Sequence, residues 1–432
     1  MAVHIIGSGP TGMALAWELR QIGQDVTIYE RKPSAGGSWW EPDLTKRDLH
    51  AHRILFDNGW VNARHFLKEL DIPWTDLFER HRDGVFPYMF KTFEFKDYLA
   101  LLTLPFVARR DRTLKDVLHG RMSPDGAKLM EHLPLIIDGI TWDVMSSYEM
   151  LESFNHVAFS GQWTQKVSGR VMGDRMQEAL EAAGVRFVFN TELKGLEMND
   201  EGYVATFSND TRLTENLLVL CVDHSPAIEL VGENWGPDAQ RQLRDTTYGC
   251  LNFLLDYPMG APELKDDLEI AANTPWKLQP RVLSDGKTLS CVICNLTEDI
   301  LTTEPETLKR GVVEQLKVPA PEGAVRIGWG STWDGKRWQF HQSSGPLSLE
   351  GQLPFFGRCP SVALCGMMSE RNTPYASLEA AVEVARRFSH QTFGTRTPLQ
   401  PFRLSTLLIL LLIVLLVFII KSDASSRTSA DV

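Results

Sequence analysis

Three glycines near the start of the chain have the spacing of a phosphate-binding turn. Gly7, Gly9 and Gly12 follow the apolar run VHII and precede the helical pattern MALAWELRQIG. The first glycine permits a tight turn, the second lets a pyrophosphate approach the backbone, and the third lets a helix pack on a strand. The N–H groups at the start of that helix attract phosphate oxygens. Strand, turn and helix in this order predict a dinucleotide site, which also includes Pro10 and Thr11.

An acidic residue follows at the distance that such a site needs. VTIYE reads as a second strand that ends in Glu30, whose carboxylate is expected to accept hydrogen bonds from an adenosine ribose. Gly36 and Gly37 come six residues later, in ERKPSAGGSWW. A glycine pair so close behind the acidic residue can bring backbone near a second part of the cofactor.

This arrangement resembles the FAD-binding signature of glutathione-reductase-type flavoproteins, and in particular amine oxidases and phytoene desaturases. The resemblance implies FAD as the cofactor, with Arg31 and Ser38 beside the acidic residue and the glycine pair. Those families usually carry Arg where this chain has Ser38. The motif that links FAD covalently in tail-anchored monoamine oxidases is absent from the sequence, so non-covalent FAD is expected. Flavin monooxygenases often place Trp near this point, as Trp39 is here.

Two later segments extend the resemblance. After the helical run RVMGDRMQEALEAAG, short strands and tight turns resemble the segment that returns to the FAD sheet, where a backbone group in the position of Leu193 meets the adenine. SVALCGMM and TPYASLEAAVEVARRF resemble the C-terminal FAD motif, which implies cofactor contacts at Gly366, Met367, Ser377 and Leu378. The family usually has Asp where this chain has Met367, and Glu370 is a candidate replacement.

The catalytic group is not evident from the sequence. Flavin oxidation mainly needs a substrate carbon held over the flavin. Many amine oxidases add a lysine, and Lys277 is a weak candidate for it. His52 occupies a place where desaturases often have a polar residue near the flavin.

The sequence shows no second G-x-G-x-x-G turn in a strand–turn–helix context. Flavin enzymes that draw electrons from NAD(P)H through a second nucleotide-binding domain carry one. We therefore expect the substrate itself to reduce the flavin.

Composition places the chain among ordinary globular proteins. Its 432 residues are 43% hydrophobic and 23% charged, and the net charge of −11 without a basic run speaks against nucleic acid as a partner. Cys291 and Cys294 form a C-x-x-C without the second pair that a zinc site needs, so we expect buried thiols and no metal site.

The C-terminal end predicts a membrane anchor. Residues 404–420, LSTLLILLLIVLLVFII, are 17 uncharged residues between Arg403 and Lys421. As a helix they would span about 26 Å, the short end of a bilayer crossing. We expect a single-pass, tail-anchored protein with its catalytic part in the cytosol, on the ER or mitochondrial outer membrane in a eukaryote.

The expected fold class is α/β, with a Rossmann-type FAD-binding domain, an α+β substrate domain and one C-terminal transmembrane helix. Residues 1–60, 165–240 and 355–392 are expected to form the FAD-binding domain, and 61–164 and 241–354 the substrate domain. A linker (393–403), the transmembrane helix (404–420) and a polar tail (421–432) follow. Residues 97–108, DYLALLTLPFVA, are expected to pack in the core, with a lipid-facing entrance as the alternative.

The leading functional hypothesis is a membrane-anchored FAD-dependent oxidoreductase that oxidises an amine or a hydrophobic substrate by hydride transfer to flavin. Three alternatives stay open: a redox-neutral flavin mutase or isomerase, an NAD(P)H-dependent flavin monooxygenase, and a degenerate flavin fold that serves as a membrane scaffold.

Overall fold

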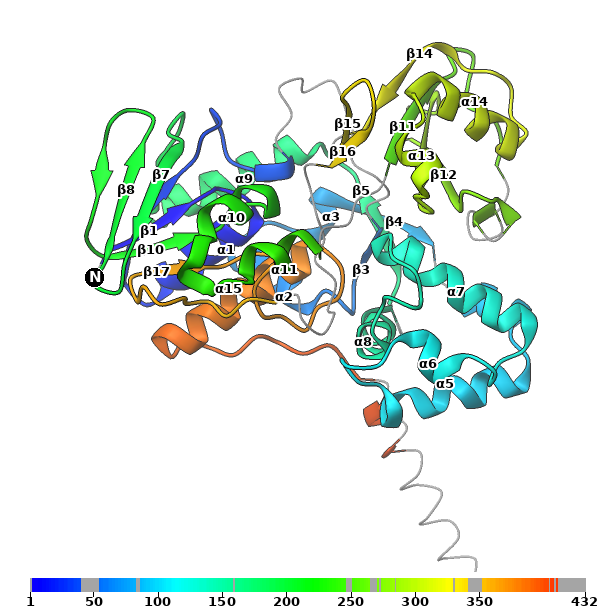
Figure 1. Cartoon of the computed structure of the whole chain (residues 1–432), viewed down its shortest axis with the longest axis horizontal. Helices are drawn as coiled ribbons and strands as arrows, with labels where there is room; N and C mark the ends of the chain where they lie inside the picture. The colour runs from blue at the N-terminus through cyan, green and yellow to red at the C-terminus, as the bar shows by residue number, and fades with distance from the viewer. Residues whose placement is uncertain are drawn as a thin grey trace, which may run out of the picture.

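The computed structural model of the chain has two parts that lie side by side, one built on a parallel sheet and the other on an antiparallel sheet and a group of helices (Figure 1). The residues described are 2–39, 54–82, 86–157, 160–245, 251–264, 270–271, 273–283, 285–328, 331–340, 352–403, 405–407 and 409–410.

A five-stranded parallel sheet organises the first part. Its strand order is β17-β10-β1-β2-β6, and every neighbouring pair is parallel. The strands come from three distant stretches of sequence: β1 (Ala2–Ile6), β2 (Asp25–Tyr29), β6 (Arg186–Val188), β10 (Leu217–Leu220) and β17 (Val362–Leu364). Buried residues run almost continuously along β1, β2 and β10, as expected for parallel strands covered on both faces.

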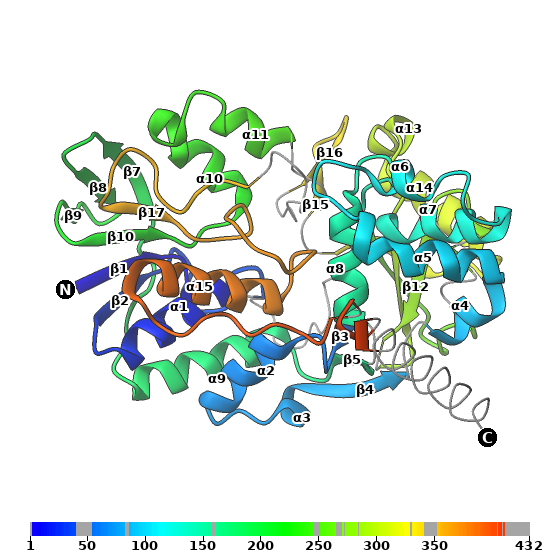
Figure 2. The same cartoon turned by 90° about the horizontal axis from the view of Figure 1, so that it is seen from below.

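Helices cover one face of this sheet. Alternate residues of β1, Val3 and Ile5, share a core with these helices, while Ile6 belongs to the core of the opposite face. The helices are α1 (Pro10–Gln21), α9 (Gly169–Ala182) and α15 (Leu378–Phe393), with α2 (Val61–Glu69) packed on α15. Figure 2 shows α15 beside α1.

A small antiparallel meander and two short helices cover the other face. Tyr203 and Phe207 of the meander pack with Tyr29 at the end of β2. The elements are β7 (Leu193–Met198), β8 (Tyr203–Phe207), β9 (Arg212–Leu213), α10 (His224–Val231), the 3-10 turn η2 (Gly232–Trp235) and α11 (Ala239–Asp245).

The second part contains an antiparallel sheet of order β12-β13-β11-β14. A hairpin turn at Asp285 and Gly286 joins β12 to β13, and Gly286 has φ +67°. The elements are β11 (Leu251–Asp256), β12 (Leu278–Val282), β13 (Thr288–Ile293), α13 (Glu298–Leu301), α14 (Pro305–Leu316), β14 (Glu322–Ile327), β15 (Ser331–Trp333) and β16 (Trp338–Phe340). The described residues 270 and 271, between β11 and β12, are helical.

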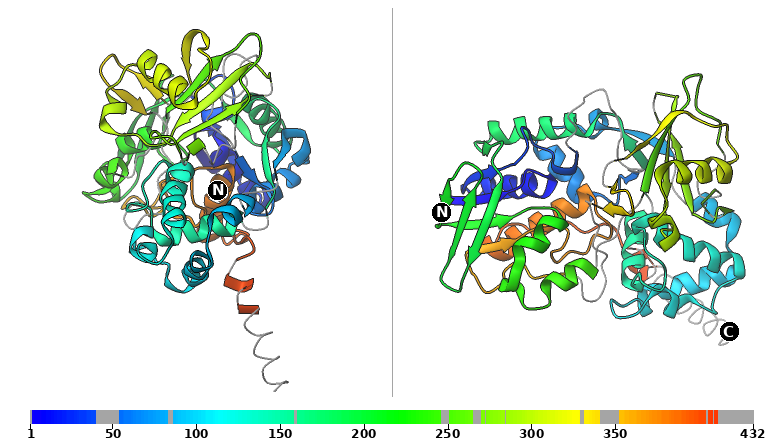
Figure 3. Two further views of the ribbon diagram at one scale, coloured as in Figure 1. Left: turned by 90° about the vertical axis from the view of Figure 1, so that its right-hand side faces the viewer. Right: turned by 45° about the horizontal axis from the view of Figure 1, so that its top comes forward.

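One further region, seen with the rest of the molecule in Figure 3, combines helices of the second part with α3 and a three-stranded sheet, which contribute Leu55, Leu77 and Phe78 to the core of the first part. Its elements are β3 (Ile54–Phe56), α3 (Trp74–Leu77), β4 (Phe78–Arg82), α4 (Phe86–Thr92), α5 (Phe95–Val107), α6 (Leu114–Leu118), α7 (Pro124–Asp138), α8 (Ser147–Val157) and β5 (Gln162–Gln165). The expectation that residues 97–108 pack in the core is only half right. Ala100 and Leu104 of α5 are buried, whereas Leu99, Leu102 and Phe106 are exposed.

Within the described residues, no helix combines the length and the apolarity of a membrane span. Most of the predicted transmembrane helix, including residues 411–420, lies outside the described residues. Cys291 and Cys294 are buried, as expected, and neither forms a disulfide among the described residues.

Candidate functional site

The N-terminal turn has the geometry that its glycines predict. Gly7 adopts φ +101°, and a Cβ on it would lie 2.5 Å from the carbonyl oxygen of Cys221 at the end of β10. A Cβ on Gly12 would lie 2.1 Å from the Gly7 carbonyl oxygen, so the start of α1 sits directly on the turn. Gly9 differs: among the described atoms, its Cβ would meet only the Gly37 Cα, at 3.8 Å. The backbone at Gly9 therefore faces the space where a pyrophosphate would be needed.

Glu30 stands beside this turn at the end of β2, with 5% of its surface exposed. Its Oε2 accepts hydrogen bonds from the N–H and the Oγ of Ser8, at 2.9 and 2.8 Å, and its Oε1 accepts one from the Lys32 N–H at 2.9 Å. A carboxylate has about four acceptor positions, so one remains for a ribose hydroxyl.

The second glycine pair is in contact with the first turn. Gly36 donates its N–H to the Ser8 carbonyl at 3.0 Å, and Lys32 Nζ donates to the Gly37 carbonyl at 2.8 Å. Gly37 has φ +57°, and a Cβ on it would lie 2.7 Å from the Gly9 Cα. Position 37 therefore requires glycine, both for its backbone conformation and for its contact with the Gly9 backbone.

Two glycines that the sequence reasoning missed allow α9 to approach the same loop. A Cβ on Gly169 would lie 2.8 Å from the Trp39 carbonyl oxygen. One on Gly173 would lie 2.9 Å from the Ala35 carbonyl oxygen. The spacing G-x-x-x-G in the run GRVMG was the available signal, since it places both residues on one face of a helix.

The loop after Glu30 also holds an unsatisfied polar group. Ser34 is 9% exposed, and its Oγ has no hydrogen-bond partner among the described residues. Such buried groups are usually hydrogen-bonded, and a cofactor phosphate or hydroxyl would satisfy this one. Arg31 is exposed and Ser38 half-buried. This orphan group and the open backbone at Gly9 both fit a bound dinucleotide.

The segment that leads to Leu193 lies next to this loop. Glu30 donates its N–H to the Val188 carbonyl, Thr191 donates to the Glu30 carbonyl and Asn190 to the Lys32 carbonyl, at 2.9–3.1 Å. Leu193 is the first residue of β7 and pairs with Phe207. The position expected near an adenine is thus connected by backbone hydrogen bonds to the ribose-binding acid.

The C-terminal motif reaches the same sheet through β17. The Gly366 N–H donates to Ser369 Oγ at 3.2 Å, and that hydroxyl donates to the Leu364 carbonyl. Met367 presents a partly buried apolar side chain where the family has Asp. Glu370 is exposed and lies 3.6 Å from Arg387, so it does not take the place of that Asp.

Arg371 is a buried cation that the sequence reasoning missed. It is 0% exposed, donates Nη1 to the Met367 carbonyl at 2.5 Å and Nε to the Thr373 carbonyl at 3.1 Å. These bonds shape the chain between β17 and α15. No local sequence signal distinguishes it from a surface arginine.

The start of α15 is capped by Ser377, whose Oγ accepts the Ala380 N–H at 3.1 Å. Leu378, the first helical residue, is buried. Glu379 follows and is also fully buried; it accepts hydrogen bonds from the N–H groups of Asn62 and Ala63 in α2. Burial raises the pKa of Glu379 from 4.5 to about 7, although these bonds work in the opposite direction.

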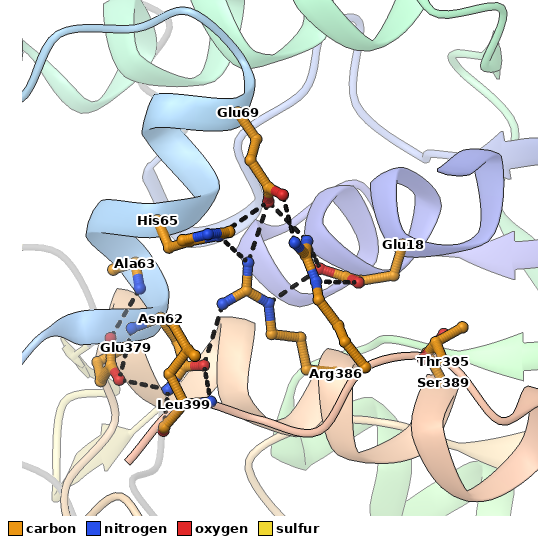
Figure 4. A network of polar contacts seen from close by, with 11 residues as sticks. Glu18, Asn62, Ala63, His65, Glu69, Glu379, Arg386, Ser389, Thr395 and Leu399 are labelled. Carbon is orange, nitrogen blue, oxygen red and sulfur yellow. Dashed lines mark hydrogen bonds and ion pairs between the residues drawn. The ribbon is translucent and has the colours of Figure 1, made fainter. Parts of the chain in front are cut away.

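A polar network fixes α15 to its neighbours (Figure 4). Arg386 is fully buried and bonds Glu18 of α1 at 2.9 Å and Glu69 of α2 at 3.1 Å. Arg396, in the segment that follows α15, donates to both carboxylates and joins this segment to the same network.

His156 of α8 lies close to the start of α15. Its ring centroid is 6.2 Å from that of Tyr375, edge to face, and Tyr375 precedes the Ser377 cap by two residues. His156 is 2% exposed, and its Nδ1 has no hydrogen-bond partner among the described residues. Burial lowers the pKa of His156 to about 4, so its imidazole is neutral near pH 7.

Of the two weak catalytic candidates, the structure describes Lys277, which lies away from this group. Lys277 has φ +53°, and its Nζ lies 3.1 Å from His132 Nε2 in α7, within the second part. Burial, and then the neighbouring Lys128, lower the pKa of Lys277. His52 lies outside the described residues.

Comparison with known proteins identifies the N-terminal region. A family described as NAD(P)-binding Rossmann-like domain matches residues 5–70. Digeranylgeranylglycerophospholipid reductase 1 of Methanopyrus kandleri is 32% identical over 83 residues, which cover 19% of this chain and 22% of the reductase. A flavin-containing monooxygenase of Arabidopsis thaliana is 39% identical over 46 residues, covering 11% of this chain and 10% of that protein. The chain thus matches less than a quarter of the length of these relatives.

Solved structures match almost the whole chain. An oxidoreductase from Methanosarcina mazei superposes with a TM-score of 0.62 at 14% identity, over 89% of this chain and 99% of the other. Cyclohexylamine oxidase from Brevibacterium oxydans gives 0.56 at 14% identity, over 90% and 98%. Wild-type putrescine oxidase gives 0.59 at 15% identity, over 91% and 99%. The chain has the α/β fold of flavin oxidoreductases. The comparisons bear out the expected enzyme class at this level and support FAD as the cofactor.

Proposed function

We propose that this protein is an FAD-dependent oxidoreductase whose own substrate, an amine or another hydrophobic molecule, reduces the flavin. The observation that carries the proposal is the contact between the turns at Gly9 and Gly37, beside a polar loop with an unsatisfied Ser34 hydroxyl. When bound, FAD supplies the acceptor for the hydride.

The residues that would hold it follow from this geometry. Backbone N–H groups at the start of α1 would receive the pyrophosphate, because the first turn of a helix leaves them without intrahelical partners. Glu30 would accept from the adenosine ribose. The start of α15 would direct its positive dipole end to the flavin ring, where it favours negative charge.

The substrate side of the site would involve His156 and Tyr375. A neutral imidazole at this position repels a protonated amine less than an imidazolium would. Its Nδ1, which has no partner among the described residues, could form one hydrogen bond with a substrate. The fold alone does not identify the substrate, and the apolar C-terminal run favours a hydrophobic one.

The deciding measurement is the absorbance spectrum of the purified full chain. We expect the spectrum of a bound flavin. If no flavin is bound even after FAD is added, the proposed enzyme is excluded and the membrane scaffold is favoured instead. Oxygen uptake with a panel of amines then separates an oxidase from a redox-neutral mutase.

A monooxygenase remains a specific alternative because of the Arabidopsis relative. The described residues contain one parallel sheet. The large sheet of the second part is antiparallel, whereas a second nucleotide-binding domain would have a parallel sheet. NADPH or NADH should therefore not bleach the flavin in the absence of oxygen. Rapid bleaching would place the protein with the monooxygenases or reductases.

The proposed location is a membrane, through residues 404–420, with the catalytic part in the cytosol. What supports it is the uncharged apolar sequence itself. Deleting residues 404–432 should release the protein from carbonate-washed membranes. Arg at both Leu411 and Val414 should act similarly, at roughly 2.5–3.5 kcal/mol for each charge near the bilayer centre.

A further inference from the structure

Helix α5 exposes a continuous apolar stripe to solvent. Phe95, Leu99, Leu102 and Phe106 are 78%, 48%, 43% and 63% exposed. Their spacing of four, three and four residues places them on one face of the helix. The opposite face, with Ala100 and Leu104, is buried in the helical core. A helix that is apolar on both faces is expected to contact apolar surroundings on both faces, and the described residues cover only one of them.

Phe90 of α4 extends the stripe. It is 70% exposed, and its ring centroid lies 6.1 Å from that of Tyr98 on α5. We name these five side chains, Phe90, Phe95, Leu99, Leu102 and Phe106, the α4–α5 apolar face. Large apolar groups gathered on one surface mark an interaction site rather than the scattered exposure of an ordinary surface.

Basic residues flank part of this face, although one of them, Lys96, also pairs with Glu94 at 3.6 Å. Residues 91–121 contain seven Lys and Arg but four Asp and Glu, in a chain with a net charge of −11. Lys91 and Lys96 are exposed beside the stripe, and Arg121 donates to Thr103 Oγ1 of α5 at 2.8 Å. Apolar side chains flanked by cations are typical of a helix that lies in the interface of an anionic membrane.

The C-terminal apolar run begins at the same end of the molecule. Arg403 interacts electrostatically with Tyr148 and Glu152 of α8, and Arg110, three residues after α5, lies over the Tyr148 ring at 4.8 Å. Figure 2 shows the short red segment at residues 405–407 on the part of the molecule that carries α4, α5 and α8. The chain therefore enters its 17-residue apolar run from the part of the molecule that also carries the α4–α5 apolar face.

We propose that the α4–α5 apolar face inserts into the surface of the bilayer that holds the C-terminal run. This inference rests on the proposed membrane location and adds a second, interfacial contact. The phenyl and leucyl side chains would enter the boundary between headgroups and acyl chains, and the flanking cations would contact anionic headgroups. Two contacts fix the orientation of the body on the membrane, which a single helix would leave free.

The test places an environment-sensitive NBD probe on the full chain. Leu99→Cys and, separately, Phe106→Cys are labelled and reconstituted into phosphatidylcholine vesicles with or without phosphatidylserine. Glu201→Cys, on the exposed β7–β8 turn, is the matched control. Cys250 lies outside the described residues, so Cys250→Ala is the parent; the other five native thiols are buried. Flavin absorbance of each sample reports the cofactor separately.

The expected result is an emission shift to shorter wavelength at residues 99 and 106, quenching by acyl-chain-brominated lipids, and no change at 201. Phosphatidylserine should strengthen the effect. Water-like emission at 99 and 106 in carbonate-resistant protein overturns the inference and leaves the anchor intact. A protein that does not enter vesicles overturns both. A shift without vesicles that grows with protein concentration assigns the face to a second copy of this chain and also overturns the inference.

Discussion

Arg386 donates its Nε to Oε1 of Glu18 at 2.9 Å, and each residue is the ninth of its helix. Because α1 and α15 both follow parallel strands of one sheet, they run in the same direction and in matched register. The pair therefore holds the starts of both helices at the same edge of the sheet. One start carries the phosphate-binding turn and the other the Ser377 cap. Glu18 and Arg386 are 368 residues apart in sequence, and their ion pair fixes the two helix starts of the candidate FAD site relative to each other.

Arg386→Met should reduce the free energy of unfolding by about 3 kcal/mol, since removing one partner of a buried ion pair typically costs 3–5 kcal/mol. The lower end applies because Arg396 still bonds Glu18 and Glu69. The measurement is urea unfolding followed by tryptophan fluorescence.

The matched control is Arg337→Gln. Arg337 pairs with Glu298 at the surface, where their side chains are 43% and 70% exposed, so its loss should change the free energy of unfolding far less than the loss of Arg386. Equal effects of the two substitutions would contradict the positioning role of the buried pair.

Glu379 should make the protein less stable as the pH rises. Its folded pKa of about 7 lies above the ordinary 4.5, so the folded state binds the proton more tightly. The resulting stabilisation is fully present below pH 4.5 and is lost as the pH rises through 7. At about 1.4 kcal/mol per pKa unit, this amounts to on the order of 3 kcal/mol.

Glu379→Gln should remove this part of the pH dependence when unfolding is measured between pH 4.5 and 8. Glu201→Gln, on the exposed turn, is the control and should keep the slope of the parent. If the Glu379 variant also keeps that slope, the carboxyl does not titrate in this range.

The N-terminal half of the site was predictable because its requirements are local. Each of Gly7, Gly12 and Glu30 is determined by the strand, turn and helix next to it, and the structure shows the close approaches that these positions imply. The family resemblance implied a cofactor role for Gly37, but the contact of Gly37 with Gly9 was not predicted.

The remainder depended on contacts between distant segments. The resemblance indicated the start of α15, but it did not indicate the burial of Glu379, Glu383 and Arg386. Glu379 and Arg386 bond residues of α1 and α2, and Glu383 accepts N–H groups of the segment just before α15. No local pattern encodes these neighbours. The solvent stripe of α5 was misread for a related reason: apolar residues on both faces of a helix predict core packing unless the missing neighbour is known.

His156 should remain neutral well below its ordinary pKa. Burial lowers that pKa from 6.5 to about 4, so the stability contributed by the neutral ring is present above pH 6.5 and is lost as the pH falls through 4. An NMR titration of histidine ring carbons should show one signal, absent from His156→Gln, that does not change above about pH 5. The exposed His119→Gln serves for assignment of a surface signal. A midpoint near 6.5 for the His156 signal would show that water reaches the ring.

The glycines of the N-terminal turn allow cofactor binding to be separated from folding. Gly12→Ala puts a methyl group 2.1 Å from the Gly7 carbonyl oxygen, so we expect the melting temperature of the flavin-free protein to fall; such overpacking typically costs 1–3 kcal/mol. Gly9→Ala has no such clash, since its Cβ meets only the Gly37 Cα at 3.8 Å, and its φ of −68° suits any L-residue. Its melting temperature should stay that of the parent.

The affinity for FAD should fall in Gly9→Ala, although its melting temperature does not. The methyl group at position 9 stands where backbone must approach the pyrophosphate, so a comparable 1–3 kcal/mol loss lowers FAD affinity about 10- to 100-fold. Gly195→Ala, in β7 with nothing within 4 Å of its Cβ, should change neither quantity. The measurements are thermal unfolding of flavin-free protein and titration with FAD by flavin fluorescence. If Gly9→Ala binds FAD like the parent, the pyrophosphate does not lie on this turn. If it instead loses stability without FAD, Gly9 is required by the fold and not by the cofactor.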